Sequence, residues 1–274
     1  MNICLFRPEE IGKPLDLKDE RALHLLKILH KKEGDTFAAG IIGGKAGRAT
    51  ITCVDVHGEK SADGRKSFKK GSISFDFVGE SDGKPLFPLK MIVGFPRPIQ
   101  LKRLLRDMAG LGVSEIHLTA TDLGEKSYLK SDLATSDAGY EMLLEGCEQA
   151  ASTHIPRLFM HESLDECLNS LENGLGGKTD SCVEGFCQTV KAALDNVAPA
   201  ESLVSFMARY CGEKSGAFSV LAAIGSERGW TERERQLLKA KGYALLSMGT
   251  RVLRTETAAT VAASLILGAM GFLN

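Results

Sequence analysis

The sequence lacks the short patterns that mark several classes of protein. Its seven cysteines include no C-x-x-C pair, and their odd number and scattered spacing argue against a zinc finger or a disulfide framework. It also contains no P-loop, no G-x-G-x-x-G and no nucleophile elbow. With 43% hydrophobic and 25% charged residues, the composition that remains is typical of an ordinary soluble globular protein of one or two domains.

An excess of positive charge is also absent. Lys and Arg together number 34 against 35 Asp and Glu, for a net charge of -1. This balance argues mildly against indiscriminate binding of polyanions, although a local basic patch would not appear in a sum over the whole chain. Charge alone therefore neither predicts nor excludes a nucleic-acid partner.

No segment is expected to cross a membrane. The N-terminus reaches Glu9 and Glu10 too early for a signal peptide. The uncharged run 257–273 touches the lower length limit of a span, but it is rich in Ala and Gly and has no basic flank on its far side. We therefore expect a buried terminal helix and a cytoplasmic protein.

The pattern of hydrophobic and polar residues changes at about residue 85. Residues 1–84 are β-rich, with one early helix in "DERALHLLKILHKK" and a long polar loop at 57–72. From 85 on, apolar runs such as "LKMIVGF" and "AFSVLAAIG" alternate with amphipathic stretches such as "IQLKRLLRDMAGLGV", and "SCVEGF" (181–186) is interpreted as a further strand. This alternation predicts an α/β fold with a parallel sheet covered by helices on both faces.

Two loops follow strands at the edge where open parallel sheets bind ligands. In "IGSERGWTERE" (224–234), Gly225 and Gly229 allow a tight turn, and Thr231 with Glu234 predicts a capping box for the next helix. Glycines at such junctions are more often structural than ligand-binding. In "SMGTRVLRTETAAT" (247–260), polar residues are dense enough to face a polar ligand or another chain; the alternative is a solvated loop with a helix cap at Thr255 or Glu256.

Other candidate sites are weaker. His24 and His30 lie on one early helix without a third ligand nearby, so we expect no metal. The basic run 97–106 is typical of a solvated helix face, with phosphate contact as the alternative.

Taken together, the two loops resemble motifs of the RNA methyltransferases that methylate N3 of a uridine in 16S ribosomal RNA, a family of the knotted SPOUT superfamily. "IGSERGWTERE" is similar to I-G-P-E-G-G-[FW]-[ST]-x-x-E, and "MGTRVLRTETAA" is similar to L-G-x-R-I-L-R-x-E-T-A. "HLLKILHKKEGD" and "EQAASTHIP" add matches near the N-terminus and in mid-chain, so the resemblance covers almost the whole chain.

The resemblance implies an N-terminal PUA-like β-barrel (1–84) for RNA and a SPOUT α/β domain (85–274) with a C-terminal trefoil knot (about 180–274). It further implies a homodimer that acts on 16S rRNA of the small ribosomal subunit and binds S-adenosylmethionine in the knot. The implied cofactor residues are Ile224, Gly225, Glu227 and Gly229 in one wall, and Ser247, Met248, Gly249, Val252, Leu253 and Thr257 in the other.

The same resemblance suggests roles for polar residues. Arg254 and Glu256 would lie beside the methyl group, where Arg254 stabilises a developing uracil anion and Glu256 either orients that arginine or accepts the proton. Arg7, His24 and Lys27 fall where the barrel would meet RNA, and we expect Arg228 to point outward to an RNA phosphate.

The chain departs from the family pattern at several positions. Family Pro and Gly are Ser226 and Arg228, family arginines are Ser152 and His30, and family Lys and Glu are Asp107 and Gly110. These departures leave two alternatives open: a non-catalytic RNA-binding protein on the same fold, or a methyltransferase with a different RNA target.

Overall fold

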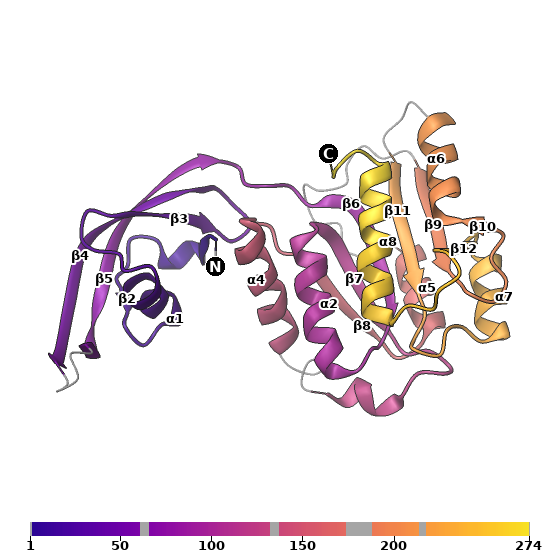
Figure 1. Cartoon of the computed structure of the whole chain (residues 1–274), viewed down its shortest axis with the longest axis horizontal. Helices are drawn as coiled ribbons and strands as arrows, with labels where there is room; N and C mark the ends of the chain where they lie inside the picture. The colour runs from indigo at the N-terminus through magenta and orange to yellow at the C-terminus, as the bar shows by residue number, and fades with distance from the viewer. Residues whose placement is uncertain (1, 61–65, 132–136, 174–187, 214–217, 274) are drawn as a thin grey trace. The chain divides into compact units, whose positions relative to one another are not determined.

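The protein forms two compact units in the computed structural model, which describes residues 2–60, 66–131, 137–173, 188–213 and 218–273 (Figure 1). One unit comprises Met1–Lys84 with Cys147–His154, and the other comprises Pro85–Gly146 with Ile155–Asn274. Residues 147–154 belong to the first unit because they bond to it: the amide of Asn2 donates to the carbonyl of Glu148 at 3.0 Å. The strand expected at 181–186 lies outside the described residues.

The first unit is built on a five-stranded sheet. Its elements are β1 (Cys4–Phe6), η1 (Pro8–Glu10), β2 (Leu15–Asp16), α1 (Glu20–Leu23), η2 (His24–Ile28), β3 (Thr36–Ile41), β4 (Ala46–Lys60) and β5 (Lys66–Ser81). The strand order is β1-β3-β4-β5-β2, with only β1 and β3 parallel. Phe6 and Phe37 both pack their rings against Phe75 in its core.

Two expectations for this unit need correction. The early helix is a single α-helical turn, α1, that continues as the π-helical turn η2. The polar loop expected at 57–72 is mostly strand, because β4 and β5 stay paired from His57 opposite Lys70 out to Lys60 opposite Lys66. Pairing between β4 and β5 satisfies the backbone N–H and C=O groups of these segments. The polar side chains of the sequence give no sign of this pairing.

The second unit contains a seven-stranded sheet. Its strands are β6 (Phe87–Gly94), β7 (Val113–Thr119), β8 (Arg157–His161), β9 (Gln188–Leu194), β10 (Glu201–Ser202), β11 (Phe218–Ile224) and β12 (Ala244–Ser247). Its helices are α2 (Pro98–Gly110), η3 (Lys126–Lys130), α4 (Ala138–Ala150), α5 (Leu164–Glu172), α6 (Leu203–Glu213), α7 (Glu232–Ala240) and α8 (Thr255–Ala269). The end of α4, from Cys147 on, belongs to the first unit. The order is β10-β12-β9-β11-β6-β7-β8 and every pair is parallel, which confirms the expected parallel sheet.

Helices cover both faces of this sheet (Figure 1). α5 and α7 pack on one face through a core that includes Leu168, Leu238 and Trp230. On the other face α8 packs against α2, α6, β6 and β11. The uncharged C-terminal run is therefore a buried helix, as expected, and no helix among the described residues is long and apolar enough to span a bilayer.

Candidate functional site

Three loops meet at one edge of the seven-stranded sheet. They follow the neighbouring strands β9, β11 and β12, and they line a cavity of about 250 Å³. Of the predicted cofactor residues, those that line it are Ile224, Gly225, Glu227, Gly229, Met248, Val252 and Leu253. Ser247, Gly249 and Thr257 adjoin these along the chain but are not lining residues. The two sequence motifs thus come together in space, at the edge where parallel sheets bind ligands.

The first loop turns tightly without strain at Arg228. The amide of Gly229 donates to the carbonyl of Ser226 at 2.9 Å, and Gly229 takes the left-handed conformation with φ +75°. Arg228 has an ordinary backbone conformation and an exposed side chain. The substitution of the family glycine by Arg228 therefore does not distort this turn.

The loop is anchored to the surrounding fold on both sides. Trp230 is buried, and its Nε1 donates to the carbonyl of Leu194 at the end of β9, at 2.9 Å. Thr231 and Glu234 form the predicted capping box at the start of α7. A close approach fixes the other side, since a Cβ on Gly94 would lie 2.5 Å from the amide nitrogen of Ser226.

Two polar features of the cavity were not foreseen from the sequence. Asp195, directly after β9, and Arg235 on α7 both line it and form a buried ion pair at 3.1 Å. The hydroxyl of Ser226 is buried and has no hydrogen-bond partner among the described residues. An acid directly after the largely apolar segment "VKAAL", which contains one lysine, was the available signal for Asp195. An unsatisfied buried hydroxyl in a cavity wall is a ready partner for a polar ligand group.

Arg254 and Glu256 lie at the start of α8. Arg254 is the N-cap residue and is exposed, so the helix cap expected at Thr255 or Glu256 is wrong by one residue. The Thr255 hydroxyl does not cap the helix and instead donates to the carbonyl of Gly225 at 3.4 Å. Glu256 is only 6% exposed. Within the described parts of the chain, neither the guanidinium of Arg254 nor the carboxylate of Glu256 has a hydrogen bond or an ion pair.

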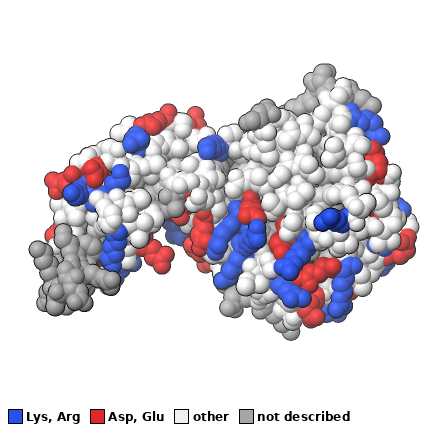
Figure 2. Space-filling model, in the orientation of Figure 1, with Lys and Arg blue, Asp and Glu red and all other residues white. Residues whose placement is uncertain are grey.

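The residues expected to face RNA are at the surface. Arg7 and Lys27 are exposed and His24 is half-buried in the first unit, while Arg228 is exposed in the second. Basic side chains also gather over α2 in Figure 2. On that helix Arg106 pairs with Glu145 at 2.7 Å, in agreement with the expected solvated face.

Other departures from the family pattern have structural roles. His30 is exposed in the left-handed conformation, with φ +51°. Ser152 is buried, and its hydroxyl accepts from the amide of His154 at 3.3 Å. Asp107 on α2 accepts from the hydroxyl of Thr260 on α8 at 3.1 Å, which joins the two helices.

A second polar cluster, also unforeseen, lies in the β7–β8 half of the same sheet. The carboxylate of Glu115 is fully buried and contacts Lys90 at 3.0 Å, His117 at 3.1 Å and the guanidinium of Arg157. Burial alone would raise the pKa of Glu115, but the hydrogen bond from His117 and the charges of Lys90 and Arg157 outweigh it and hold the pKa at about 2.

A larger cavity adjoins this cluster. It has a volume of about 950 Å³, follows the ends of β7 and β8, and is lined by residues that include Thr121 and His161. The available sequence signal was the polar residues at 115, 117 and 119 within a predicted strand. The structure buries all seven residues of that strand, β7. Buried polar groups in a central strand call for a specific partner.

Comparison with known proteins identifies the chain's relatives. A family model described as the RNA methyltransferase domain matches residues 83–267. The chain is 38% identical to the ribosomal RNA small subunit methyltransferase E of Treponema pallidum, over 97% of this chain and 91% of that protein. It is 31% identical to the ribosomal RNA small subunit methyltransferase E 1 of Borreliella burgdorferi, over 97% of each.

Solved structures share the fold across the whole chain. A methyltransferase from Legionella pneumophila, solved with bound SAM, superposes with a TM-score of 0.68 at 20% identity, covering 98% of both chains. The ribosomal RNA small subunit methyltransferase E of Neisseria gonorrhoeae, bound to S-adenosyl methionine, gives 0.63 at 21% identity, covering 98% of this chain and 97% of that one. With the family match over two thirds of its length, the chain belongs to the RNA methyltransferase family.

Proposed function

We propose that the protein transfers a methyl group from S-adenosylmethionine to N3 of a uridine in 16S ribosomal RNA. The observation that carries this proposal is the cavity built jointly by the two motif loops, 224–229 and 248–253. The relatives named for methylation of small-subunit ribosomal RNA support the RNA class. The uridine and its N3 atom follow from the family resemblance of the same motifs.

The cavity suits S-adenosylmethionine. Its walls offer backbone groups at Gly225 and Gly229, apolar side chains at Met248 and Leu253, and the unpartnered hydroxyl of Ser226. Such a mixture of apolar surface and a few placed polar groups is typical of a cofactor site. The two structural neighbours solved with this cofactor support the assignment.

Arg254 and Glu256 are the proposed catalytic residues. When bound, S-adenosylmethionine supplies an electrophilic methyl group on a sulfonium. Uridine N3 attacks that carbon as the sulfur–carbon bond breaks, so N3 must lose its proton and negative charge develops on the uracil. Arg254, exposed and unpaired within the described residues, is free to stabilise that charge. Glu256 has no bond to Arg254 in the single chain, which favours proton acceptance over orientation of the arginine.

The remaining parts of the proposal concern architecture. We assign residues 1–84 as a PUA-like RNA-binding barrel that uses Arg7, His24 and Lys27, and 85–274 as the SPOUT domain with a trefoil knot at about 180–274. The strand order supports the knot. β12 pairs with β9 on the side away from β11, and after β12 the chain crosses back so that α8 packs on β11 and β6. The unpartnered Arg254 and Glu256 support a homodimer in which a second chain completes the site.

The test is the modification of 16S RNA in cells that lack the gene and carry variants of it. Mass spectrometry of nucleosides should show N3-methyluridine restored by the wild type and by a Lys239→Ala control on the exposed face of α7. Arg254→Ala should lower the rate of methyl transfer about 10²–10³-fold, the range for loss of one charge-stabilising donor. N3-methyluridine that persists in the deletion strain, or full activity of both Arg254→Ala and Glu256→Ala, would refute the proposal.

A further inference from the structure

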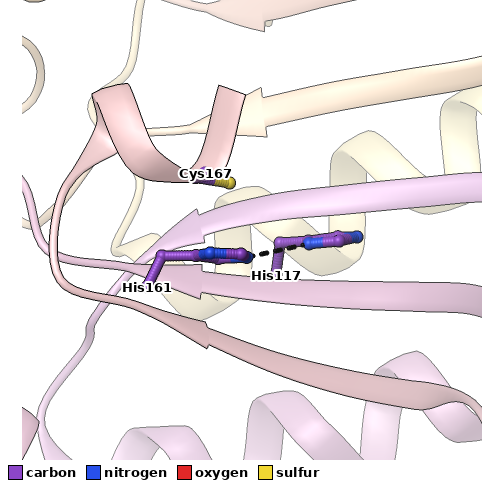
Figure 3. Close-up of side chains that lie close together, drawn as sticks. All are labelled: His117, His161 and Cys167. Atoms are coloured by element: carbon purple, nitrogen blue, oxygen red, sulfur yellow. Dashed lines mark hydrogen bonds between the residues drawn. The ribbon is translucent and has the colours of Figure 1, made fainter. Parts of the chain in front are cut away.

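Three side chains of types that can bind metal ions lie close together beside the larger cavity, which one of them, His161, lines. His117 is on β7, His161 ends the neighbouring strand β8, and Cys167 is on α5, which covers that face (Figure 3). They are 1%, 6% and 0% exposed. One donor atom from each lies within 4.8 Å of the other two.

The two imidazoles present their nitrogens to each other. Nδ1 of His117 is 3.0 Å from Nε2 of His161, and the rings are nearly parallel at 14°. Figure 3 shows the two nitrogens facing one another, with the Cys167 sulfur on the α5 side of that junction. The arrangement joins two strands and one helix through nitrogen and sulfur donors.

Glu115 prepares His117 to act as a ligand. Its carboxylate, held between Lys90 and Arg157, lies 3.1 Å from Nε2 of His117. The carboxylate can only accept a hydrogen bond from Nε2–H, and this leaves Nδ1, the atom that faces His161, as the nitrogen with the lone pair. Metal-binding histidines almost always donate their other nitrogen to such a carboxylate or carbonyl.

The spacing is close to that of a tetrahedral zinc site. Zinc–nitrogen bonds of about 2.0–2.1 Å and a zinc–sulfur bond of about 2.3 Å require nitrogens about 3.3 Å apart and a nitrogen–sulfur distance of about 3.6 Å. The nitrogens must therefore separate by a few tenths of an ångström, and the sulfur must approach by up to about 1.2 Å.

We propose that His117 Nδ1, His161 Nε2 and Cys167 Sγ bind one divalent ion of the zinc type. Two imidazoles and a thiolate are donors that select zinc over magnesium or calcium. As the ion binds, the Cys167 thiol loses its proton to solvent and the proton of His161 moves from Nε2 to Nδ1, so the hydrogen bond between the two imidazoles is replaced by two bonds to the ion. A water molecule from the cavity that His161 lines takes the fourth position. The ion braces β7, β8 and α5 and takes no part in methyl transfer. The expectation of no metal rested on the scattered cysteines and on His24 and His30, and it did not consider ligands that strand pairing brings together.

Cobalt titration of the untagged, chelator-treated chain tests the site, because Co²⁺ in a tetrahedral sulfur-containing site gives visible ligand-field bands and a thiolate charge-transfer band. We expect one Co²⁺ per chain, displaced by Zn²⁺. Cys167→Ala should abolish the charge-transfer band and weaken binding more than about 100-fold, since even loss of an outer partner weakens it about 10–100-fold. Cys147→Ala, a change at another buried thiol, should leave both unchanged.

A wild-type chain that binds no Co²⁺, or a charge-transfer band that survives in Cys167→Ala, overturns the proposal. If Cys167→Ala does not fold, X-ray absorption of the zinc-loaded wild type decides. Two nitrogen ligands and one sulfur ligand support the site, and a spectrum without sulfur refutes it.

Discussion

Two cavities follow the strands of the seven-stranded sheet, and the residues around them differ in kind. After β11 and β12 the chain places glycine-containing loops, and the cavity there combines glycine backbone and apolar side chains with the buried ion pair of Asp195 and Arg235. Behind β7 and β8 it places buried titratable groups, with Glu115 and His117 inside the strand itself. Backbone walls can fit the shape of an organic cofactor, whereas a buried cluster of side-chain donors suits an ion.

Contacts of Asp122 are among those that connect the halves. Asp122, which follows β7, accepts hydrogen bonds from the side chains of Thr231 at 2.8 Å and Arg233 at 2.8–2.9 Å. Its amide donates to Glu234 at 2.9 Å. The start of α7 is thus held from the other half of the sheet, and the following variants test how independent the halves are.

The largest effect is expected from Asp195→Ala. It leaves the buried guanidinium of Arg235 with only a 3.8 Å contact to the exposed carboxylate of Glu232, which should lower the free energy of unfolding by about 3–5 kcal/mol. Urea unfolding measures this. It should also weaken S-adenosylmethionine binding while leaving Co²⁺ binding in the other half unchanged.

The matched control for that variant is Glu201→Ala, which breaks the exposed pair with Arg209 and should cost less than about 1 kcal/mol. Equal losses of unfolding free energy in the two variants would show that the buried Asp195–Arg235 pair contributes no more to stability than the more exposed Glu201–Arg209 pair.

Gly94→Ala should have a smaller effect, confined to the cofactor half. Its Cβ would meet the backbone of Gly225 and Ser226 at 2.5–2.8 Å, so the first motif loop must shift. We expect a loss of about 1–3 kcal/mol in unfolding free energy and at least about tenfold weaker S-adenosylmethionine binding by calorimetry. Gly110→Ala, with open space around its Cβ, is the control. Unchanged cofactor affinity in Gly94→Ala would show that the first motif loop does not take part in binding the cofactor.

The halves also differ in how far the sequence predicted them. The strands, the parallel sheet and the capping box of Thr231 and Glu234 follow from local patterns, and the two motif loops follow from resemblance. Local patterns did not predict the cluster of Glu115, His117, His161 and Cys167. This cluster depends on which strands are neighbours and on the placement of α5. Strand pairing is a long-range property that hydrophobic periodicity does not encode.

The smallest effect is the pH dependence of the link between the halves. The hydrogen bond from Arg233 lowers the pKa of Asp122 below its usual value of 3.8, so this carboxylate binds its proton less readily in the folded state than in the unfolded state. The stabilisation is present above that value and is lost as the pH falls through the lower, folded-state pKa. Because both side chains are partly exposed, it should be no more than about 1 kcal/mol.

Asp122→Asn measures this effect. Urea unfolding should show the wild type as the more stable protein at pH 7 and the difference should shrink as the pH is lowered below 4. A difference that stays constant with pH would mean that the charge of Asp122 does not contribute.

The central claim is that S-adenosylmethionine binds between the loops after β9, β11 and β12. Hydrogen–deuterium exchange of the wild-type protein with and without the cofactor tests it most directly. We predict slower exchange in 224–229 and 248–253 and little change in 120–126 and 161–166. Protection confined to 120–126 and 161–166, or no protection in either motif loop at saturating cofactor, would contradict it.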